Sequence, residues 1–161
     1  MPEAFDRDRV LALDDEMLGR ECAFESYKGS GNGGQKRNKT SSSVRVRHLP
    51  TGVTAEDSAE RSWFRNRANA LRKLRLKIGL LYRNEPSPLF RLACALDHAD
   101  YPRWRAILLD ALAANGYEPK PAAAFLGMTP SALVKLLYRD GELWEQVARE
   151  RLALGKTRLR N

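Results

Sequence analysis

Residues that would mark a metal centre or a disulfide scaffold are scarce in this sequence. Its 161 residues include 2 cysteines and 2 histidines, and Cys22 and Cys94 stand far apart with no CxxC pair. The cysteine pattern therefore supports neither a disulfide framework nor a zinc site. We expect both cysteines to be small core residues of a protein in a reducing cytoplasm.

Long apolar stretches are missing as well. No run approaches the ~18–20 residues that a membrane span needs, so we do not expect an integral membrane protein. Residues 1–8 carry three acidic side chains and one basic one and contain no apolar stretch typical of a secretory signal, which predicts a cytoplasmic location. The chain is 43% hydrophobic and 30% charged, which is enough apolar content for a core and too much for a disordered protein.

Positive charge is concentrated in the middle of the chain. Residues 21–83 carry 14 basic and 5 acidic side chains, a net charge of +9, whereas the whole chain carries +8. This excess favours a polyanionic partner, because each neutralised phosphate releases counterions. A solvated surface of lysine and arginine is the alternative. Binding to a lipid surface fits less well, because membrane-surface helices present bulky apolar residues to the lipid.

The first half of the chain predicts a small sheet with helices packed on it. We expect a helix over residues 13–20 with Asp14 as its N-cap, and a strand over residues 23–28. Residues 43–49 alternate, with Val44, Val46 and His48 on one side, which is typical of a half-buried strand. The turn at residues 50–52 then predicts a hairpin with a second strand over residues 53–55.

From residue 57 to about residue 83 the period becomes helical. One stripe is apolar and a separate stripe is basic, so the helix would pack one face on the sheet and offer the other to solvent or phosphate. The apolar stripe consists of Phe64, Leu71, Leu74, Ile78 and Leu81, and the basic stripe of Arg61, Arg65 and Arg72.

Two prolines within residues 84–88 predict a domain boundary, because proline ends helices. Helices are expected over residues 101–115, 121–126, 130–139 and 142–154, with Thr129 as the N-cap of the third. Residues 123–137 have a sequence pattern typical of a helix-turn-helix. The predicted class is α+β: a small mixed sheet with packed helices over residues 1–84, followed by a small all-α bundle over residues 85–161.

The segment between the first two predicted strands is rich in glycine and polar residues. Gly29, Gly31 and Gly34 match the spacing of the dinucleotide fingerprint, but residues 35–43 lead into a strand, whereas that site needs a helix there. A phosphate-binding P-loop also fails, because Gln35 stands where that motif requires lysine. A basic loop around Gly33-Gly34-Gln35 remains.

Residues 30–40 read SGNGGQKRNKT and lead into Val44-Arg45-Val46, the turn HLPTGV at residues 48–53 and a helix that opens ERS at residues 60–62. This order strongly resembles the catalytic domain of class I peptide chain release factors and their stand-alone ribosome-rescue relatives. The resemblance covers residues 13 to about 80, half of the chain. The sequence departs from the family's pattern at residues 32, 36–37, 57–58 and 63–64.

The resemblance implies that Gly33, Gly34 and Gln35 enter the peptidyl-transferase centre and promote attack of water on the peptidyl-tRNA ester. The Gln35 backbone N–H would stabilise developing negative charge, its side chain would help to place the water, and a glutamine methyltransferase would modify it. No cofactor and no metal are expected. The partners implied are large-subunit ribosomal RNA and peptidyl-tRNA. The candidate RNA contacts are Lys28, Ser30, Lys36, Arg37, Asn38, Lys39, Thr40, Arg61, Arg65 and Arg72.

No segment before residue 13 is long enough for the domains that recognise a stop codon, so we expect codon-independent peptide release on stalled ribosomes or split large subunits. The helical half would dock on the ribosome, bind a recruiting protein or cap the first domain. The alternative is a non-catalytic RNA- or DNA-binding module with a helix-turn-helix regulatory half. His48, Trp104 and Trp144 are predicted to be packing residues. Turn and cap roles are expected for Ser42, Ser43 and Ser62.

Overall fold

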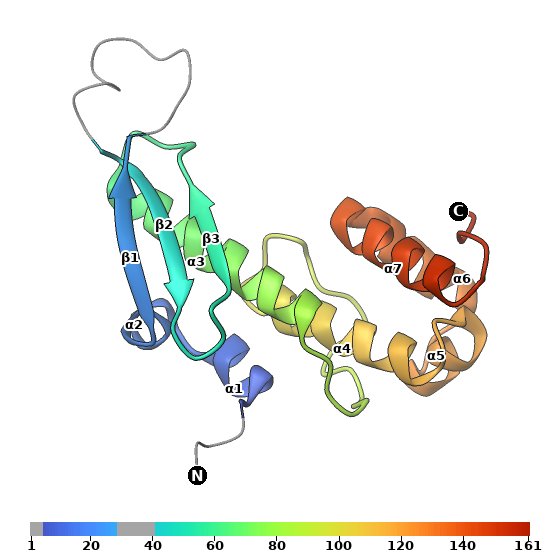
Figure 1. Ribbon diagram of the computed structural model, residues 1–161. Helices are drawn as coiled ribbons and strands as arrows, with labels where there is room; N and C mark the ends of the chain where they lie inside the picture. The colour runs from blue at the N-terminus through green and yellow to red at the C-terminus, as the bar shows by residue number, and fades with distance from the viewer. Residues whose placement is uncertain (1–4, 29–40) are drawn as a thin grey trace. The chain divides into compact units, whose positions relative to one another are not determined.

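The computed structural model describes residues 5–28 and 41–161 of the chain (Figure 1). The chain divides into two compact units, Met1–Ile78 (unit 1) and Gly79–Asn161 (unit 2). The domain division expected after residue 84 stays a prediction. The elements in chain order are α1 (Arg7–Ala12), α2 (Asp15–Arg20), β1 (Cys22–Tyr27), β2 (Ser43–His48), β3 (Thr54–Asp57), α3 (Trp63–Leu81), α4 (Tyr101–Ala114), α5 (Pro119–Leu126), α6 (Pro130–Arg139) and α7 (Gly141–Ala153).

The sheet of unit 1 has the strand order β1-β2-β3, and both neighbouring pairs are antiparallel. Phe24 lies opposite Val46, which in turn lies opposite Ala55. The α+β class is thus confirmed, but the sheet is antiparallel rather than mixed. A short turn can join β2 and β3 only antiparallel, and here Gly52, at φ +71°, donates its N–H to the His48 carbonyl at 2.8 Å.

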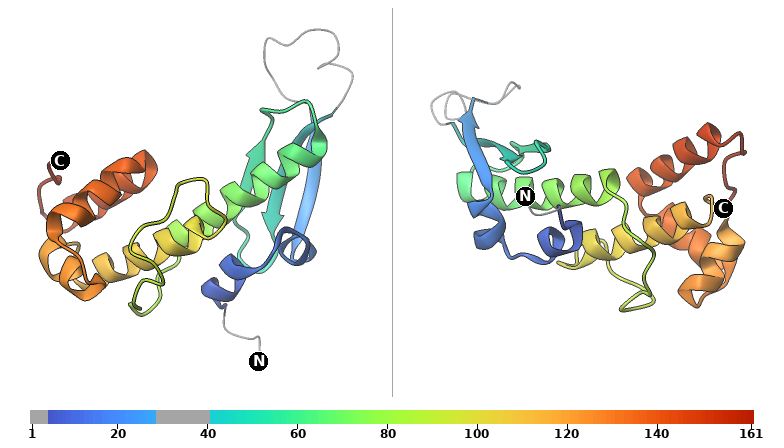
Figure 2. Two further views of the ribbon diagram at one scale, coloured as in Figure 1. Left: turned by 180° about the vertical axis from the view of Figure 1, so that it is seen from behind. Right: turned by 60° about the horizontal axis from the view of Figure 1, so that its bottom comes forward.

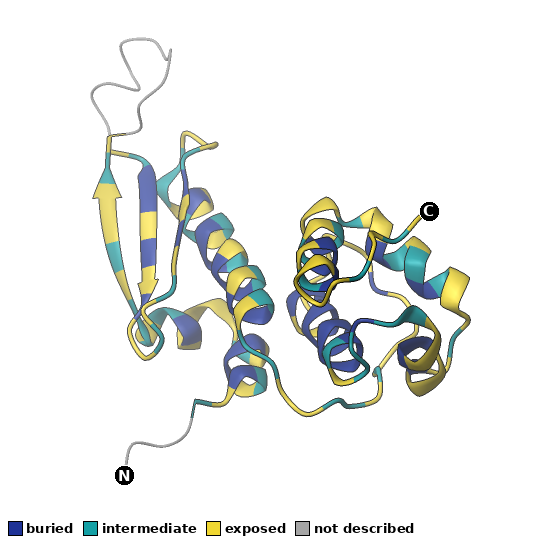
Figure 3. Ribbon diagram, turned by 45° about the vertical axis from the view of Figure 1, so that its right-hand side comes forward, coloured by how far each residue is buried: buried dark blue, intermediate teal, exposed yellow. Residues whose placement is uncertain are grey.

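One face of the sheet is buried and the other is open. Along β2 the side chains of Val44, Val46 and His48 are buried, whereas Arg45 and Arg47 are exposed, as the alternation predicts (Figure 3). The helix α3 runs across the buried face (Figure 2). Burial of these apolar side chains against α3 provides the main stabilisation of unit 1.

The helix α3 begins six residues later than residue 57, where the period predicts it. Asp57 still pairs with Val44 in the sheet, and residues 58–62 form a turn. Three members of the apolar stripe are fully buried, but Phe64 is 78% exposed and Leu81 66% exposed. Near the start of α3 the buried residues are Ala70 and Asn66, four and eight residues before Leu74. Residues spaced by four lie on one face of a helix, and Phe64 lies off that face, away from the sheet.

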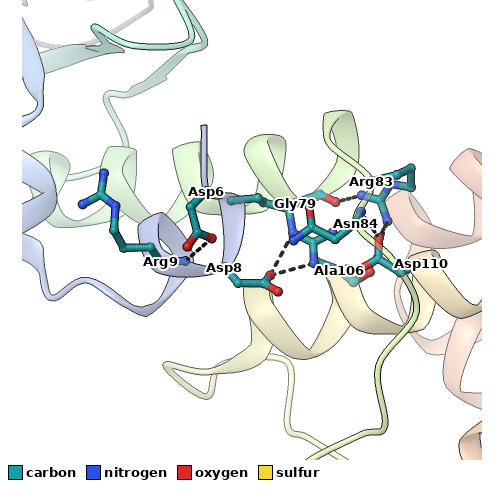
Figure 4. A network of polar contacts seen from close by, with 9 residues as sticks. Asp6, Asp8, Arg9, Gly79, Arg83, Asn84, Ala106 and Asp110 are labelled. Atoms are coloured by element: carbon teal, nitrogen blue, oxygen red, sulfur yellow. Dashed lines mark hydrogen bonds and ion pairs between the residues drawn. The ribbon is translucent and has the colours of Figure 1, made fainter. Parts of the chain in front are cut away.

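Two short helices precede the sheet. The side chain of Asp14 accepts a hydrogen bond from Met17 N at 2.8 Å and caps α2, as predicted, although the helix starts at Asp15 rather than at residue 13. The sequence reasoning missed α1. Asp6 caps it by accepting from Arg9 N at 3.0 Å (Figure 4).

Unit 2 confirms the four predicted helices: α6 has the predicted ends, and the ends of the other three differ from the predicted ones by at most two residues. Gly127 ends α5 with φ +71°, a conformation that favours glycine, and Thr129 caps α6 by accepting from Ala132 N. Nearly every residue of α4 is buried, including Trp104, whose indole N–H donates to the Arg91 carbonyl. Successive helices pack on one another from α4 to α7.

The segment before α4 is held by a buried carboxylate. Asp110, on α4, accepts hydrogen bonds from Arg83 Nη1 at 3.1 Å and from Asn84 N at 3.0 Å (Figure 4). Arg83 also donates to the Gly79 carbonyl. Within the described ranges, no helix has both the length and the apolar character required to cross a bilayer.

Candidate nucleic-acid interface

The ends of β1 and β2 define where the Gly33-Gly34-Gln35 segment leaves the sheet. Tyr27, the last residue of β1, pairs with Ser43, the first residue of β2. The connection between them includes residues 29–40, which lie outside the described residues. Catalysis by Gly33, Gly34 and Gln35 and methylation of Gln35 therefore stay predictions. The same holds for RNA contacts by Ser30, Lys36, Arg37, Asn38, Lys39 and Thr40.

Asn66 anchors the chain just before β2 to the first turn of α3. Its side chain is fully buried, and its Nδ2 donates to the carbonyls of Ser42 at 2.7 Å and Glu60 at 2.9 Å. Its Oδ1 accepts from Glu60 N at 2.9 Å. Because an unsatisfied buried polar group costs about 1–3 kcal/mol, this network strongly favours one arrangement of residue 42 and the turn before α3.

A second hydrogen bond joins the start of α3 to the end of β1. The indole N–H of Trp63 donates to Ser26 Oγ at 2.8 Å. Together with the Asn66 network, this bond places the first turn of α3 at the end of the sheet where the β1–β2 connection begins and ends (Figure 1). We call this region the loop end of unit 1, comprising residues 26–28, 41–43 and 58–66.

Three of the four described candidate RNA contacts lie at the loop end. Lys28 and Arg61 are exposed, and Arg65 is 74% exposed with its Nη1 3.7 Å from Glu60 Oε2. Arg72 is half-buried and lies seven residues beyond Arg65, about 10 Å further along α3. The predicted basic stripe is wrong in one respect, because Arg61 precedes the helix instead of lying on it.

Other cations of α3 are used inside unit 1. Lys73 Nζ lies 2.6 Å from Asp57 Oδ2, and Lys77 Nζ donates to the Thr54 carbonyl at 2.9 Å. Burial alone would raise the pKa of Asp57, but hydrogen bonds from Lys73, from the Ala59 amide and from Asn69 outweigh it and lower that pKa. These two lysines hold α3 against the edge strand β3.

The open face of the sheet carries a neutralised cation. Arg45 lies between two carboxylates, 3.1 Å from Glu56 and 3.3 Å from Glu25, and its guanidinium stands over the Tyr27 ring. The hydrogen bond to Glu56 and the charge of that carboxylate raise the pKa of Arg45. Positive charge without a strong carboxylate partner is therefore found at the loop end rather than at the centre of this face.

The buried imidazole of His48 is a packing residue, as predicted. It is fully buried, with Nδ1 2.8 Å from Thr51 Oγ1 and Nε2 3.3 Å from Glu21 Oε2. A hydrogen bond from Arg9 lowers the pKa of Glu21 against the opposing effect of burial. This geometry gives His48 a role in securing the β2–β3 turn.

The remaining candidate reactive groups have structural roles. Ser62 Oγ accepts from Arg65 N at 3.4 Å, as expected of a cap residue. Cys94 is buried as predicted, whereas Cys22 is only half-buried, and partial burial raises the pKa of its thiol to about 11. Such a thiol is protonated at neutral pH and a poor nucleophile. Residues 5–28 and 41–161 contain no group of three or more His, Cys, Asp or Glu that could hold a metal ion.

In unit 2, α5, the turn at residues 127–129 and α6 provide the predicted helix-turn-helix segment. The exposed residues of α6 include Ser131, Lys135 and Tyr138. Arg139 donates to the Cys94 carbonyl at 2.5 Å. A DNA-reading helix presents several polar or basic side chains near its start, and α6 begins Pro130-Ser131-Ala132. Trp144 is half-buried and packs edge-to-face on Tyr138, consistent with its predicted packing role.

Sequence reasoning missed the two residues that organise the loop end, Asn66 and Trp63. Asparagine is a poor helix former, so its position inside a helical pattern was the available signal for a special role. Nothing in the spacing could have identified Ser26 as the acceptor for Trp63, because the two residues are 37 positions apart.

Comparison with known proteins agrees with this architecture. Residues 15–88 match the family model of the RF-1 domain. Over 78 residues, 48% of this chain, the sequence is 41% identical to peptide chain release factor 1 of Lachnoclostridium phytofermentans, covering 20% of that protein. It is 41% identical to peptide chain release factor 2 of Lactiplantibacillus plantarum over 78 residues, 48% of this chain and 19% of that protein.

A third relative, peptide chain release factor 1 of Thermotoga maritima, is 40% identical over 72 residues, 45% of this chain and 21% of that protein. The chain thus spans about a fifth of the length of these relatives. The matched region contains α2, the sheet with its β1–β2 connection, and α3. Residues 15–88 are therefore the part of the chain that is similar to the RF-1 domain.

Proposed function

We propose that this protein is a codon-independent release factor that hydrolyses the peptidyl-tRNA ester on stalled ribosomes or split large subunits in the cytoplasm. The observation that supports the proposal is the match of residues 15–88 to the RF-1 domain, together with Gly33-Gly34-Gln35 in the sequence between β1 and β2. Lys28, Arg61 and Arg65 at the loop end would contact phosphates of ribosomal RNA and orient the domain without specifying sequence.

In the proposed reaction, water attacks the ester carbonyl, the bond between that carbon and the tRNA 3′ oxygen breaks, and the peptide leaves as a carboxylic acid. The proton of the water passes to the 3′ oxygen. The backbone N–H of Gln35 would stabilise negative charge on that oxygen or on the tetrahedral intermediate, a contribution of about 2.7–4 kcal/mol for one preorganised donor. Two preceding glycines allow the backbone to approach RNA closely.

Two further partners belong to the same proposal. A glutamine methyltransferase would modify the Gln35 side chain. Unit 2, with its helix-turn-helix segment, would bind the ribosome or a recruiting protein, since its α6 exposes few of the side chains that a DNA-reading helix needs.

A release assay tests the activity. The purified full chain is added to ribosome complexes that carry labelled peptidyl-tRNA and have no stop codon in the A site, and to split large subunits with the same label. We expect peptide release from at least one of the two. If neither releases peptide at saturating protein, the catalytic proposal is wrong, and a non-catalytic RNA- or DNA-binding module with a regulatory helical half takes its place.

Two substitutions at Gln35 separate the backbone donor from the side chain. Gln35→Ala keeps the N–H and should retain part of the activity, whereas Gln35→Pro removes it and should lower the release rate about a hundredfold to a thousandfold further. Both variants should bind ribosomes with near-parental affinity. Equal release rates for the two variants would exclude the backbone-donor mechanism.

A further inference from the structure

The first turn of α3 presents an aromatic side chain to solvent at the loop end. Phe64 is 78% exposed, the highest value among the exposed large hydrophobic residues of the described chain. Its ring meets that of Trp63 edge-to-face, with centroids 5.3 Å apart and an interplanar angle of 89°. Solvating an aromatic ring is unfavourable, so an exposed phenylalanine on a rigid helix is a candidate contact for a ligand.

The neighbouring groups hold this ring in place without a ligand. Trp63 is fixed by its hydrogen bond to Ser26, and Trp63 in turn supports one side of Phe64. Asn66, in the same turn, is buried and bonded to Ser42 and Glu60. The Phe64 ring therefore stands on a preorganised base, and binding through its open face costs little conformational entropy.

Exposed cations lie on both sides of Phe64 in the sequence. Arg61 precedes α3, Arg65 follows Phe64 directly, and both are exposed. The Glu60 carboxylate lies 3.7 Å from Arg65, a separation at which an exposed pair contributes little. An aromatic face beside guanidinium groups is the combination that binds unpaired nucleotides, because the base stacks on the ring and the phosphates meet the cations.

We propose that Phe64, supported by Trp63, is a stacking site for one unpaired base of RNA, with Arg61 and Arg65 contacting the adjacent phosphates. The other exposed large apolar residues of unit 1 do not extend this site: Met17 lies on α2, and Leu49 follows the end of β2 opposite to Ser43. A single ring with charged neighbours fits one base, whereas a protein partner requires a contiguous apolar patch of several hundred Å².

The test compares four variants of the full chain for binding to purified large ribosomal subunits and to a labelled single-stranded oligoadenylate. Phe64→Ala should weaken binding to each probe about 5- to 150-fold, the range for loss of one base–aromatic stack. Phe64→Tyr should retain near-parental affinity, because the ring remains, and Phe64→Leu should behave like Phe64→Ala. The matched control is Phe90→Ala, since Phe90 in unit 2 is also exposed but already has the guanidiniums of Arg91 and Arg103 over its ring.

The salt dependence separates stacking from charge. Phe64→Ala should leave the slope of log affinity against log salt unchanged, because the ring neutralises no phosphate. Parental affinity of Phe64→Ala for both probes would overturn the proposal. Retention of binding by Phe64→Leu would also overturn it and would indicate an apolar contact with a ribosomal protein instead.

The inference rests on the proposed function only for the identity of the RNA. If the parental chain releases no peptide but Phe64→Ala still loses affinity for oligoadenylate, the proposed function fails and the stacking site stands. If release proceeds and Phe64→Ala binds both probes as the parental chain does, the stacking site fails and the proposed function stands.

Discussion

The loop end of unit 1 and the interior of unit 2 use their arginines in opposite ways. At the loop end of unit 1, Arg61 and Arg65 point to solvent, and the best carboxylate contact described for them is 3.7 Å long. In unit 2, Arg105 is 1% exposed and its Nη1 lies 3.0 Å from Asp140 and 2.9 Å from Glu142. Arg151 is likewise buried and donates to the carbonyls of Tyr117 and Thr157.

This difference shows why a count of basic residues locates an interface only approximately. Even within the segment of net charge +9, Arg45 and Lys73 are paired with carboxylates, and Lys77 is bonded to a backbone carbonyl. Cations that already have strong internal acceptors gain little from a phosphate, because the new contact would replace an existing one. Among the described residues, Arg61 and Arg65 at the loop end are exposed and have no carboxylate contact shorter than 3.7 Å.

The largest effect that we predict is a loss of stability when a buried arginine of unit 2 is removed. Arg105→Ala leaves Asp140 without its charged partner in a mostly buried position, and we expect a loss of about 3 kcal/mol in the free energy of unfolding. The matched control is Arg103→Ala on the same helix, which removes an exposed guanidinium and its contact with the Phe90 ring and should lower the free energy of unfolding by no more than about 1 kcal/mol. Urea unfolding followed by tryptophan fluorescence measures both losses. Equal losses would show that the buried ion pairs of Arg105 do not stabilise unit 2.

The next effect concerns binding. If Arg61 and Arg65 face RNA phosphates, replacing both with alanine should flatten the slope of log affinity for large ribosomal subunits against log salt by about 1.4–1.8. The double variant Lys73→Ala/Lys77→Ala, on α3 beyond Arg65, should leave the slope unchanged and lower stability instead, because these lysines bond Asp57 and the Thr54 carbonyl. The same change of slope in both variants would mean that internal bonding does not decide which cations meet RNA.

Sequence patterns predicted most of the elements because the signals are local. Gly127 and Thr129 determine where α5 ends and α6 begins. The alternation at residues 43–49 determines which face of β2 is buried. The start of α3 was misplaced because residues 57–62 are held by distant partners, including the pairing of Asp57 with Val44. Periodicity alone does not contain that information.

The candidate site could likewise be predicted from the sequence only where the signals are local. The motif around Gly33-Gly34-Gln35 and the exposed Arg61 and Arg65 could be predicted from residue types. The supporting bonds of Asn66 to Ser42 and of Trp63 to Ser26 could not, because each joins residues more than 20 positions apart. Exposure of Phe64 was also missed, since its spacing of seven from Leu71 is compatible with a buried stripe.

The smallest expected effect is a pH dependence in unit 2. Burial alone would raise the pKa of Asp140, but hydrogen bonds from Tyr101, from the Leu143 amide and from Arg105 outweigh it and hold the pKa below its ordinary value of 3.8. A carboxyl group whose pKa is lower in the folded than in the unfolded protein stabilises the fold fully above its unfolded pKa. That contribution is lost as the pH falls through the lower, folded-state pKa.

The free energy of unfolding of the parental chain should therefore decline between about pH 5 and pH 2, and Asp140→Asn should decline less over the same interval. Tyr101→Phe removes a 2.7 Å hydrogen bond to the Asp140 carboxylate, so it should raise the pKa of Asp140 and reduce the part of the stability that depends on its ionisation. Urea unfolding at several pH values, followed by the fluorescence of Trp104 and Trp144, measures these curves. Other carboxylates titrate in the same interval, so the difference between each variant and the parental chain is the quantity that isolates Asp140. A decline in Asp140→Asn as steep as in the parental chain would show that the Arg105–Asp140–Tyr101 cluster adds no pH-dependent stability.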